Sequence, residues 1–141
     1  MSALAPEIRA FLDAHVTGTL GTTAPGGRVR QSLVYFARDG DRLLITTEAG
    51  RLKARDVART GWASLCVAGG EPPFPSVALA GPASVLTTGI GPATAAVVQR
   101  ILGATEPPDP QSDEALAGVG RVILAIDVER VGPVSYIEPA A

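Results

Sequence analysis

The sequence predicts a mainly β fold: a closed or split antiparallel barrel of six or seven strands with flanking helices. Short β-rich runs follow one another along the chain, and turns containing Pro, Gly and Asp separate them, which is typical of hairpins. After a first helix, only two helical segments interrupt the strands, so strand and helix do not alternate as in a parallel α/β fold. The length of 141 residues is typical of one domain, which is expected to cover residues 1–141.

The N-terminal half is predicted to contain one helix followed by a three-stranded meander. Proline at the start and a stripe formed by Ile8, Phe11 and Leu12 indicate a helix over residues 6–15. The β-rich runs TGTLGTT, RVRQSLVYFAR and RLLITT follow, and the turn sequences APGG and DGD join them. Antiparallel pairing of these three consecutive strands is therefore expected.

A helix and two further strands are expected in the middle of the chain. Gly50 opens and Gly61 closes a helical stretch directly after the third strand. The runs WASLCVA and SVALAGPASVL are predicted strands, and the loop GGEPPFP links them. Because proline cannot donate to a β-ladder, the pair Gly81-Pro82 indicates a bulge or an edge position at which a barrel would bend.

The remainder of the chain is predicted to contain one helix, an irregular segment and two strands. The helix covers residues 93–102, where Ala96, Val97 and Ile101 share one face. Residues 104–118 are rich in proline and acidic residues and are expected to form an irregular, solvated excursion. RVILAIDVERV is then predicted to be one long strand, with GPVSYIE as its short partner.

Composition and charge exclude several kinds of function. The formal net charge is −2 and both signs are scattered, so no basic surface for nucleic acid is expected. No apolar run approaches the roughly 18 residues needed to span a bilayer, and the start lacks a signal-peptide pattern, so we expect a cytoplasmic protein without a membrane partner. Hydrophobic residues make up 46% of the chain, which indicates that a second subunit covers part of the surface.

Several individual residues are expected to have structural roles. The single cysteine, Cys66, lies in the apolar run WASLCV and is predicted to pack in the core. His15 is the only histidine and is expected to cap the first helix or lie at the surface. Without further histidines or a cluster with metal-ligand spacing, neither a Ser-His-Asp hydrolase nor a metalloenzyme is expected. The aromatic side chains are assigned to the core or to a subunit contact, with stacking on a cofactor ring or substrate as the alternative. They are Tyr35, Phe36, Trp62 and Phe74.

Hydroxyl and basic side chains gather where the third strand meets the following helix. They are Thr46, Thr47, Arg51, Lys53 and Arg55, and Lys53 is the only lysine in the chain. Free N–H groups at a helix start attract anions, hydroxyl groups add hydrogen bonds and the cations add full charge. The pattern predicts a phosphate-binding corner. From these residues alone, a solvated basic helix end remains the alternative.

The residues from Val16 to Gly61 resemble the N-terminal half of the split β-barrel flavin and deazaflavin oxidoreductases, a superfamily that includes pyridoxamine phosphate oxidase. The most specific match is LLITT, a glycine and then Lys-Ala-Arg before a helix, which resembles the phosphate-binding stretch of that superfamily. The runs SVALAGPASV and RVILAIDVERV continue the resemblance. It implies the FMN-binding type of split barrel.

The resemblance also implies a cofactor and its contacts. In length the chain is similar to the branch that uses coenzyme F420, a 5-deazaflavin. Residues equivalent to those that hold the cofactor phosphate would be Thr46, Thr47, Arg51 and Lys53. The cofactor ring would lie in a groove between two subunits of a homodimer, along the adjacent strand and against Gln31, Ser32, Leu33 and Val34. No catalytic residue is assigned.

Asp56 and Leu52 depart from the pattern of the superfamily. The helix commonly reads Lys-Ala-Arg-Asn in the superfamily, but here Asp56 occupies the Asn position, and Leu52 replaces a polar or basic residue. A carboxylate close to a phosphate weakens its binding, unless Asp56 pairs with Arg55 or Arg59 or faces away.

Three functions are compatible with this pattern. The first is an oxidoreductase that binds F420 and transfers a hydride to an unsaturated small molecule. The second is an oxidase or reductase of the same fold that uses FMN, because both cofactors present a phosphate to the same corner. The third is a non-catalytic carrier of a flavin or a tetrapyrrole.

Overall fold

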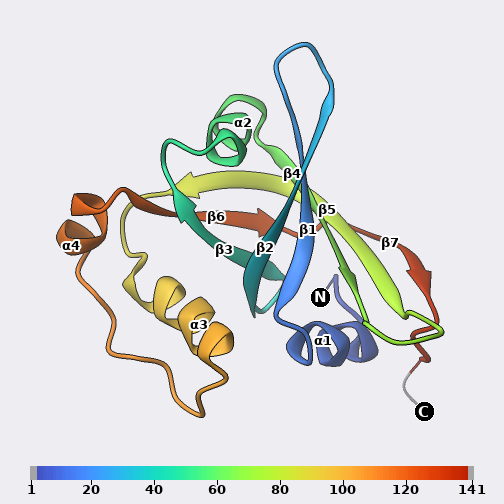
Figure 1. Ribbon diagram of the computed structural model, residues 1–141. Coiled ribbons are helices and arrows are strands. Elements are labelled where there is room, and N and C mark those ends of the chain that lie inside the picture. Colours follow the sequence, from blue (N-terminus) through green and yellow to red (C-terminus); the bar gives the residue numbers. More distant parts are fainter. Residues whose placement is uncertain (1–2, 140–141) are drawn as a thin grey trace.

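A computed structural model describes residues 3–139 as an antiparallel β-barrel with four helices at its periphery (Figure 1). Within these residues seven strands occur in the order β4-β1-β2-β3-β6-β5-β7, and β4 also pairs with β5. That additional pairing closes six strands into a ring and leaves β7 attached to β5 alone, which confirms the predicted barrel of six to seven strands. The elements are α1 (Pro6–Asp13), β1 (Thr17–Thr23), β2 (Val29–Asp39), β3 (Arg42–Glu48), α2 (Leu52–Thr60), β4 (Trp62–Ala68), β5 (Ser76–Leu86), α3 (Gly91–Leu102), α4 (Asp113–Gly118), β6 (Arg121–Asp127) and β7 (Arg130–Ser135).

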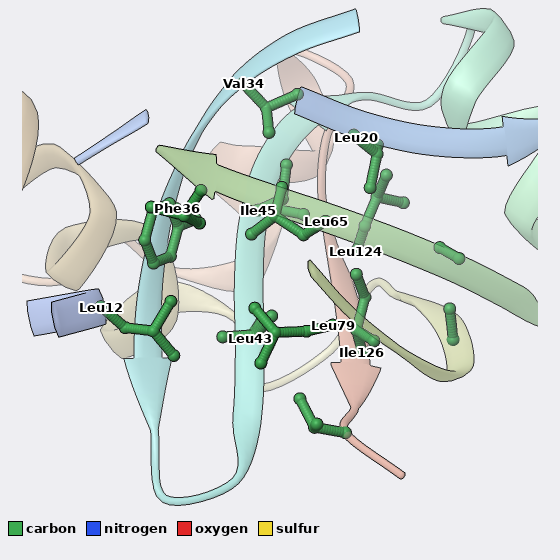
Figure 2. Packing of buried hydrophobic residues seen from close by; sticks show 14 of the residues in the cluster. Leu12, Leu20, Val34, Phe36, Leu43, Ile45, Leu65, Leu79, Leu124 and Ile126 are labelled. Carbon is green, nitrogen blue, oxygen red and sulfur yellow. The ribbon is translucent and has the colours of Figure 1, made fainter. Parts of the chain in front are cut away.

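The inside of the barrel is filled by apolar side chains that point inward from alternate strand positions (Figure 2). Leu43 and Ile45 of β3 meet Leu65 of β4 and Leu124 of β6 in this cluster, and Phe36 of β2 is completely buried. The alternation follows from the period of two residues in a strand. Phe36 is thus a core residue, as predicted.

A second apolar cluster lies on the outer side of β3 and β6. Leu44 and Ile123 point outward there and pack with Ile90, Val97 and Leu116 from the segments around α3 and α4. Strands β3 and β6 are therefore buried on both faces, which is why their sequences read as continuous apolar runs rather than as alternating patterns. Ile101 was predicted on the same face of α3 as Val97, but it is largely exposed because it lies at the end of that helix.

The bend predicted at Gly81-Pro82 coincides with a change of neighbours along β5. Residues 76–82 of β5 pair with β4, whereas residues 83–86 pair with β6. Gly81 lies so close to the end of β6 that a Cβ atom there would be 1.8 Å from the carbonyl oxygen of Asp127. Glycine permits this approach because it has no side chain.

Two predictions for the C-terminal third are wrong. RVILAIDVERV is not one strand, because β6 ends at Asp127 and β7 begins at Arg130. Between them, the N–H of Val128 donates to Asp41 O and the N–H of Glu129 donates to Ala80 O, so the chain leaves the ladder with β3 and joins β5. The excursion over residues 104–118 also contains α4, whose start is capped by the Ser112 hydroxyl accepting from the N–H of Ala115.

Among the described residues, the outward side of β1, of β4 and of the first part of β2 (residues 29–35) is exposed, and we call it the open face. Further along β2, Ala37 is covered by α3. Its large apolar or aromatic members are Val29, Leu33, Tyr35 and Trp62, all of which are exposed. Cys66 is also exposed on this face, and the prediction that it packs in the core is wrong. The reason is the alternation in β4, where Leu65 and Val67 take the inward positions.

The end of α1 is closed by His15, as expected for a capping residue. Its Nδ1 atom lies 2.7 Å from the carbonyl oxygen of Phe11, and its ring stacks on the Phe11 ring with the centroids 4.2 Å apart. The imidazole is therefore engaged by its own helix. Within residues 3–139 no helix has the length and apolar character needed to cross a membrane.

Candidate cofactor-binding site

A pocket of about 210 Å³ lies where the start of α2 meets strand β2. The end of the β1–β2 hairpin that includes the turn between Thr23 and Val29, which we call the β1–β2 arm, extends past the barrel at the same end of the molecule as α2 (Figure 1), and α2 contacts β1. Side chains from the two elements therefore meet although some 20 residues of sequence separate them. The pocket is lined by Arg30, Ser32, Arg51, Leu52 and Lys53.

The start of α2 offers the pocket free N–H groups and positive charge. Arg51 occupies the position before the first helical residue, and no side chain caps the helix there. The N–H groups of Ala54 and Arg55 donate to Arg51 O, so those of the first two residues of α2 are the ones left for an anion, and the helix dipole adds positive potential. Lys53 is half-buried and makes no ion pair within residues 3–139, whereas Arg51 Nε lies 3.7 Å from Glu48 Oε2.

Asp56 lies one turn further along α2, and its carboxylate joins three elements. The residue is only 1% exposed. Its Oδ2 atom accepts hydrogen bonds from Thr22 Oγ1 at 2.9 Å and from Arg30 Nε at 2.8 Å, while Oδ1 accepts from Arg59 Nη1 at 3.2 Å. The predicted alternative of pairing with Arg59 is confirmed. The bonds to β1 and β2 had not been predicted.

Burial and hydrogen bonding act in opposite directions on the Asp56 carboxyl group. Burial favours its neutral form, but the bonds from Arg30, Thr22 and Arg59 favour the carboxylate and together hold its pKa below the ordinary value. Asp56 is therefore negatively charged at neutral pH. Its charge is directed at two arginines rather than left open toward the pocket.

Arg30 connects this network to the pocket. It faces Thr22 across the β1–β2 ladder, and both residues reach the same oxygen of Asp56. Only the Nε–H of Arg30 is used in that bond, so the two terminal nitrogens remain available where the side chain lines the pocket. The sequence did carry a signal for this residue, since Arg30 and Ser32 are two apart on one strand and must share a face.

The structure brings together three of the eight predicted cofactor contacts, namely Ser32, Arg51 and Lys53. Gln31 and Leu33 point the other way, onto the open face, whereas Val34 is buried in the core. Thr46 and Thr47 are on opposite faces of β3 because they are consecutive in a strand. Thr47 is buried, and the Oγ1 atom of Thr46 is buried without a hydrogen-bond partner among the described residues.

These residues fit a phosphate group. Among the described residues, the pocket combines one ammonium group without an ion pair, one guanidinium group with free terminal nitrogens, a hydroxyl group and a helix start without a side-chain cap. Each is a type of donor that binds phosphate in proteins. Leu52, which also lines the pocket, is half exposed and offers apolar surface beside these donors.

A six-stranded antiparallel barrel with an extra strand, flanking helices and a basic corner defines the class of split-barrel proteins. Residues 4–135 match the family model described as pyridoxamine 5'-phosphate oxidase, and the chain therefore belongs to that family. Members of this family are often flavin-dependent oxidoreductases, and some are non-catalytic. No curated protein matches the sequence.

Solved structures with the same fold come from functionally different proteins. A protein described as an F420 reductase is 21% identical, with a TM-score of 0.69 over 88% of this chain and 94% of the other. A conserved hypothetical protein from Mycobacterium tuberculosis is 24% identical, with a TM-score of 0.73 over 93% and 82%. The heme storage protein HutZ from Vibrio cholerae is 16% identical, with a TM-score of 0.66 over 95% and 96%. At these identities the similarity establishes the fold.

Proposed function

We propose that the protein is a homodimeric oxidoreductase that binds coenzyme F420 and transfers a hydride to an unsaturated small molecule. The observation that carries this proposal is the pocket at the start of α2, where Lys53 has no carboxylate partner among the described residues. Lys53, Arg51 and the start of α2 together favour a ligand that supplies negative charge. The phosphate of the cofactor supplies it.

Each part of the chain has a defined task in this proposal. Lys53, Arg51 and the first N–H groups of α2 hold the phosphate, and Ser32 adds a hydroxyl donor. Leu33 and Gln31 lie on the open face, on the other side of β2 from this pocket, so we expect them to contact a cofactor ring only across the dimer contact. The bound deazaflavin supplies the hydride chemistry. The protein's own contribution is therefore binding, orientation and exclusion of water.

FMN is the alternative cofactor, because members of the family are often flavin-dependent oxidoreductases and FMN carries a phosphate as well. Fluorescence titrations of the purified protein with F420 and with FMN distinguish the two. We expect micromolar or tighter binding of F420 and weaker binding of FMN. Tighter binding of FMN would move the assignment to the alternative, and binding of neither would refute the proposed function.

A non-catalytic carrier is the second candidate, supported by the fold shared with a heme storage protein. Turnover separates the two candidates. Reduced F420 is mixed with the protein and a panel of enones, quinones and tetrapyrroles, and its oxidation is followed by absorbance. Oxidation of the cofactor by an acceptor supports the oxidoreductase, whereas tight binding without turnover of any acceptor supports the carrier.

Replacing Lys53 with alanine is expected to weaken F420 binding by about 1.5–3 kcal/mol, the usual contribution of a hydrogen bond to a charged group. The free energy of unfolding should hardly change, because Lys53 makes no ion pair among the described residues. Arg28→Ala is the matched control, since it removes one exposed cation near the tip of the β1–β2 arm and outside the pocket. If Lys53→Ala binds F420 as tightly as the wild type does, the phosphate does not bind in this pocket.

The open face is the proposed dimer contact. Leu33 is 75% exposed there, Tyr35 and Trp62 lie on the same side of the sheet, and the strand positions between them are small or uncharged. Exposed apolar and aromatic side chains on one face of a sheet are typical of subunit contacts. We expect the second subunit to complete the cofactor groove.

Leu33→Asp is expected to separate the dimer. Each subunit then loses about 1.5–3 kcal/mol of apolar burial, so the dissociation constant should rise at least about 100-fold. Analytical ultracentrifugation measures this constant. Val119→Asp serves as the control, because Val119 is 67% exposed, close to the value for Leu33, but lies beside α4, away from the open face. If Leu33→Asp sediments as the wild type does, the contact lies elsewhere.

A further inference from the structure

The Asp56 carboxylate is buried directly behind the phosphate pocket, where a negative charge opposes anion binding. We propose that Asp56 nevertheless promotes binding of the phosphate, because it is the positioning residue that aims Arg30 into the pocket. This inference rests on the proposed function for the identity of the anion, a phosphate ester. The role of Asp56 in orienting Arg30 does not depend on which cofactor carries that ester.

The geometry of the hydrogen bonds supports a positioning role. A guanidinium group is planar and its donors have fixed directions, so anchoring Nε fixes where the two terminal nitrogens point. Arg30 Nε donates to Asp56 Oδ2 at 2.8 Å, and the same side chain lines the pocket with Arg51 and Lys53. The bond to Asp56 therefore fixes the side chain of Arg30, which is 30% exposed, as a third cation of the pocket beside Arg51 and Lys53.

Asp56 is itself held in place from the other sides. Thr22, on the neighbouring strand, donates to Oδ2, while Arg59, one turn further along α2, donates to Oδ1. Arg59 also donates to the carbonyl oxygen of Thr23. The carboxylate therefore cannot rotate without breaking bonds to β1 and within α2. The position of Arg30 is set by the barrel and α2 together rather than by the pocket's ligand.

The negative charge of Asp56 and its role in positioning Arg30 lead to opposite predictions for phosphate binding by the Asp56→Asn variant. If the charge of Asp56 dominates, removing it should strengthen phosphate binding, because one nearby negative charge disappears. If position dominates, binding should weaken, because the neutral amide is a poorer acceptor for Arg30 Nε. We expect F420 to bind about tenfold more weakly, the order expected when one charge-assisted hydrogen bond is lost.

The experiment measures binding of F420 and of its phosphate-free deazaflavin core to four proteins. They are the wild type, Asp56→Asn, Arg30→Lys, which keeps the charge of Arg30 without an Nε anchor, and the double variant. We expect Asp56→Asn to weaken binding of F420 only, and to add almost nothing once Arg30 is lysine. Asp13→Asn is the control, because Asp13 pairs with Arg38 outside the pocket. Stronger or unchanged F420 binding by Asp56→Asn, or additive effects in the double variant, would overturn the proposal.

A second measurement needs no cofactor. Its first readout uses the wild-type protein, so it does not depend on how well a variant folds. In protein labelled with ¹⁵N-arginine, NMR reports the Nε–H of Arg30, and inorganic pyrophosphate is the probe. We expect this signal to be protected from exchange with water and to shift on addition of pyrophosphate, and Thr22→Val, which keeps the carboxylate, to reduce both effects. If pyrophosphate shifts Arg30 but no flavin binds, the proposed function fails and the role of Asp56 stands. A rapidly exchanging Arg30 signal that pyrophosphate does not shift would refute that role.

Discussion

Asp56→Ala is expected to lower the free energy of unfolding by about 3 kcal/mol at neutral pH, the lower end of the range for breaking a buried ion pair. The carboxylate accepts from Thr22, Arg30 and Arg59, so its removal leaves three donors without their acceptor. The loss is not larger because Arg30 and Arg59 keep some contact with water, their side chains being 30% and 40% exposed.

This loss should depend on pH in a defined direction. The hydrogen bonds hold the pKa of Asp56 in the folded protein below its value of about 3.9 in the unfolded chain. The stabilisation from ionised Asp56 is therefore complete above the unfolded-state pKa. It is lost as the pH falls below about 4 and through the lower pKa of the folded state.

Urea unfolding of the wild type and Asp56→Ala at pH 7 and at pH 3 measures both effects. The difference between the two proteins should be largest at pH 7 and shrink at pH 3. Asp13→Ala is the comparison, since Asp13 pairs with Arg38 at the surface and its loss should cost much less. A difference of the same size at both pH values would mean that the Asp56 charge does not stabilise the fold.

The β1–β2–β3 meander could be predicted because its pairings join strands that are neighbours in sequence. The turns APGG and DGD fixed it, whereas the pairing of β7 with β5, rather than with the strand before it, was not predicted. Lys53 and Arg51 were also predictable, because a helix start directly after a strand is a local feature. Interactions between neighbours in sequence leave a pattern in the sequence.

Features that depend on distant contacts were missed or predicted wrongly. Cys66 was assigned to the core, although the alternation in β4 places it on the open face. The Asp56–Arg30 bond joins residues 26 positions apart, and only the folded β1–β2 arm brings them together. From the sequence alone, Asp56 was therefore interpreted as a negative charge that opposes phosphate binding. In the structure its carboxylate is bonded to Thr22, Arg30 and Arg59, so its charge is not directed at the pocket.

Gly81→Ala is expected to destabilise the protein by about 3 kcal/mol or more, the upper part of the range for overpacking. The methyl group would lie 1.8 Å from Asp127 O and 2.8 Å from Asp127 C. Both atoms belong to the backbone, so no side chain can rotate away to make room. Either β5 or the end of β6 must move, and with it the ladder that closes the barrel.

Thermal and urea unfolding of Gly81→Ala measure this cost, and Gly118→Ala is the matched control. Gly118 has no atom within 4 Å of the position of a Cβ, so alanine there should leave stability unchanged or slightly raise it. Wild-type stability of Gly81→Ala would mean that β5 and β6 are further apart at this point. At Gly81, β5 passes from pairing with β4 to pairing with β6. A large loss of stability would show that the barrel needs a residue without a side chain at this point, so that β5 can approach the end of β6.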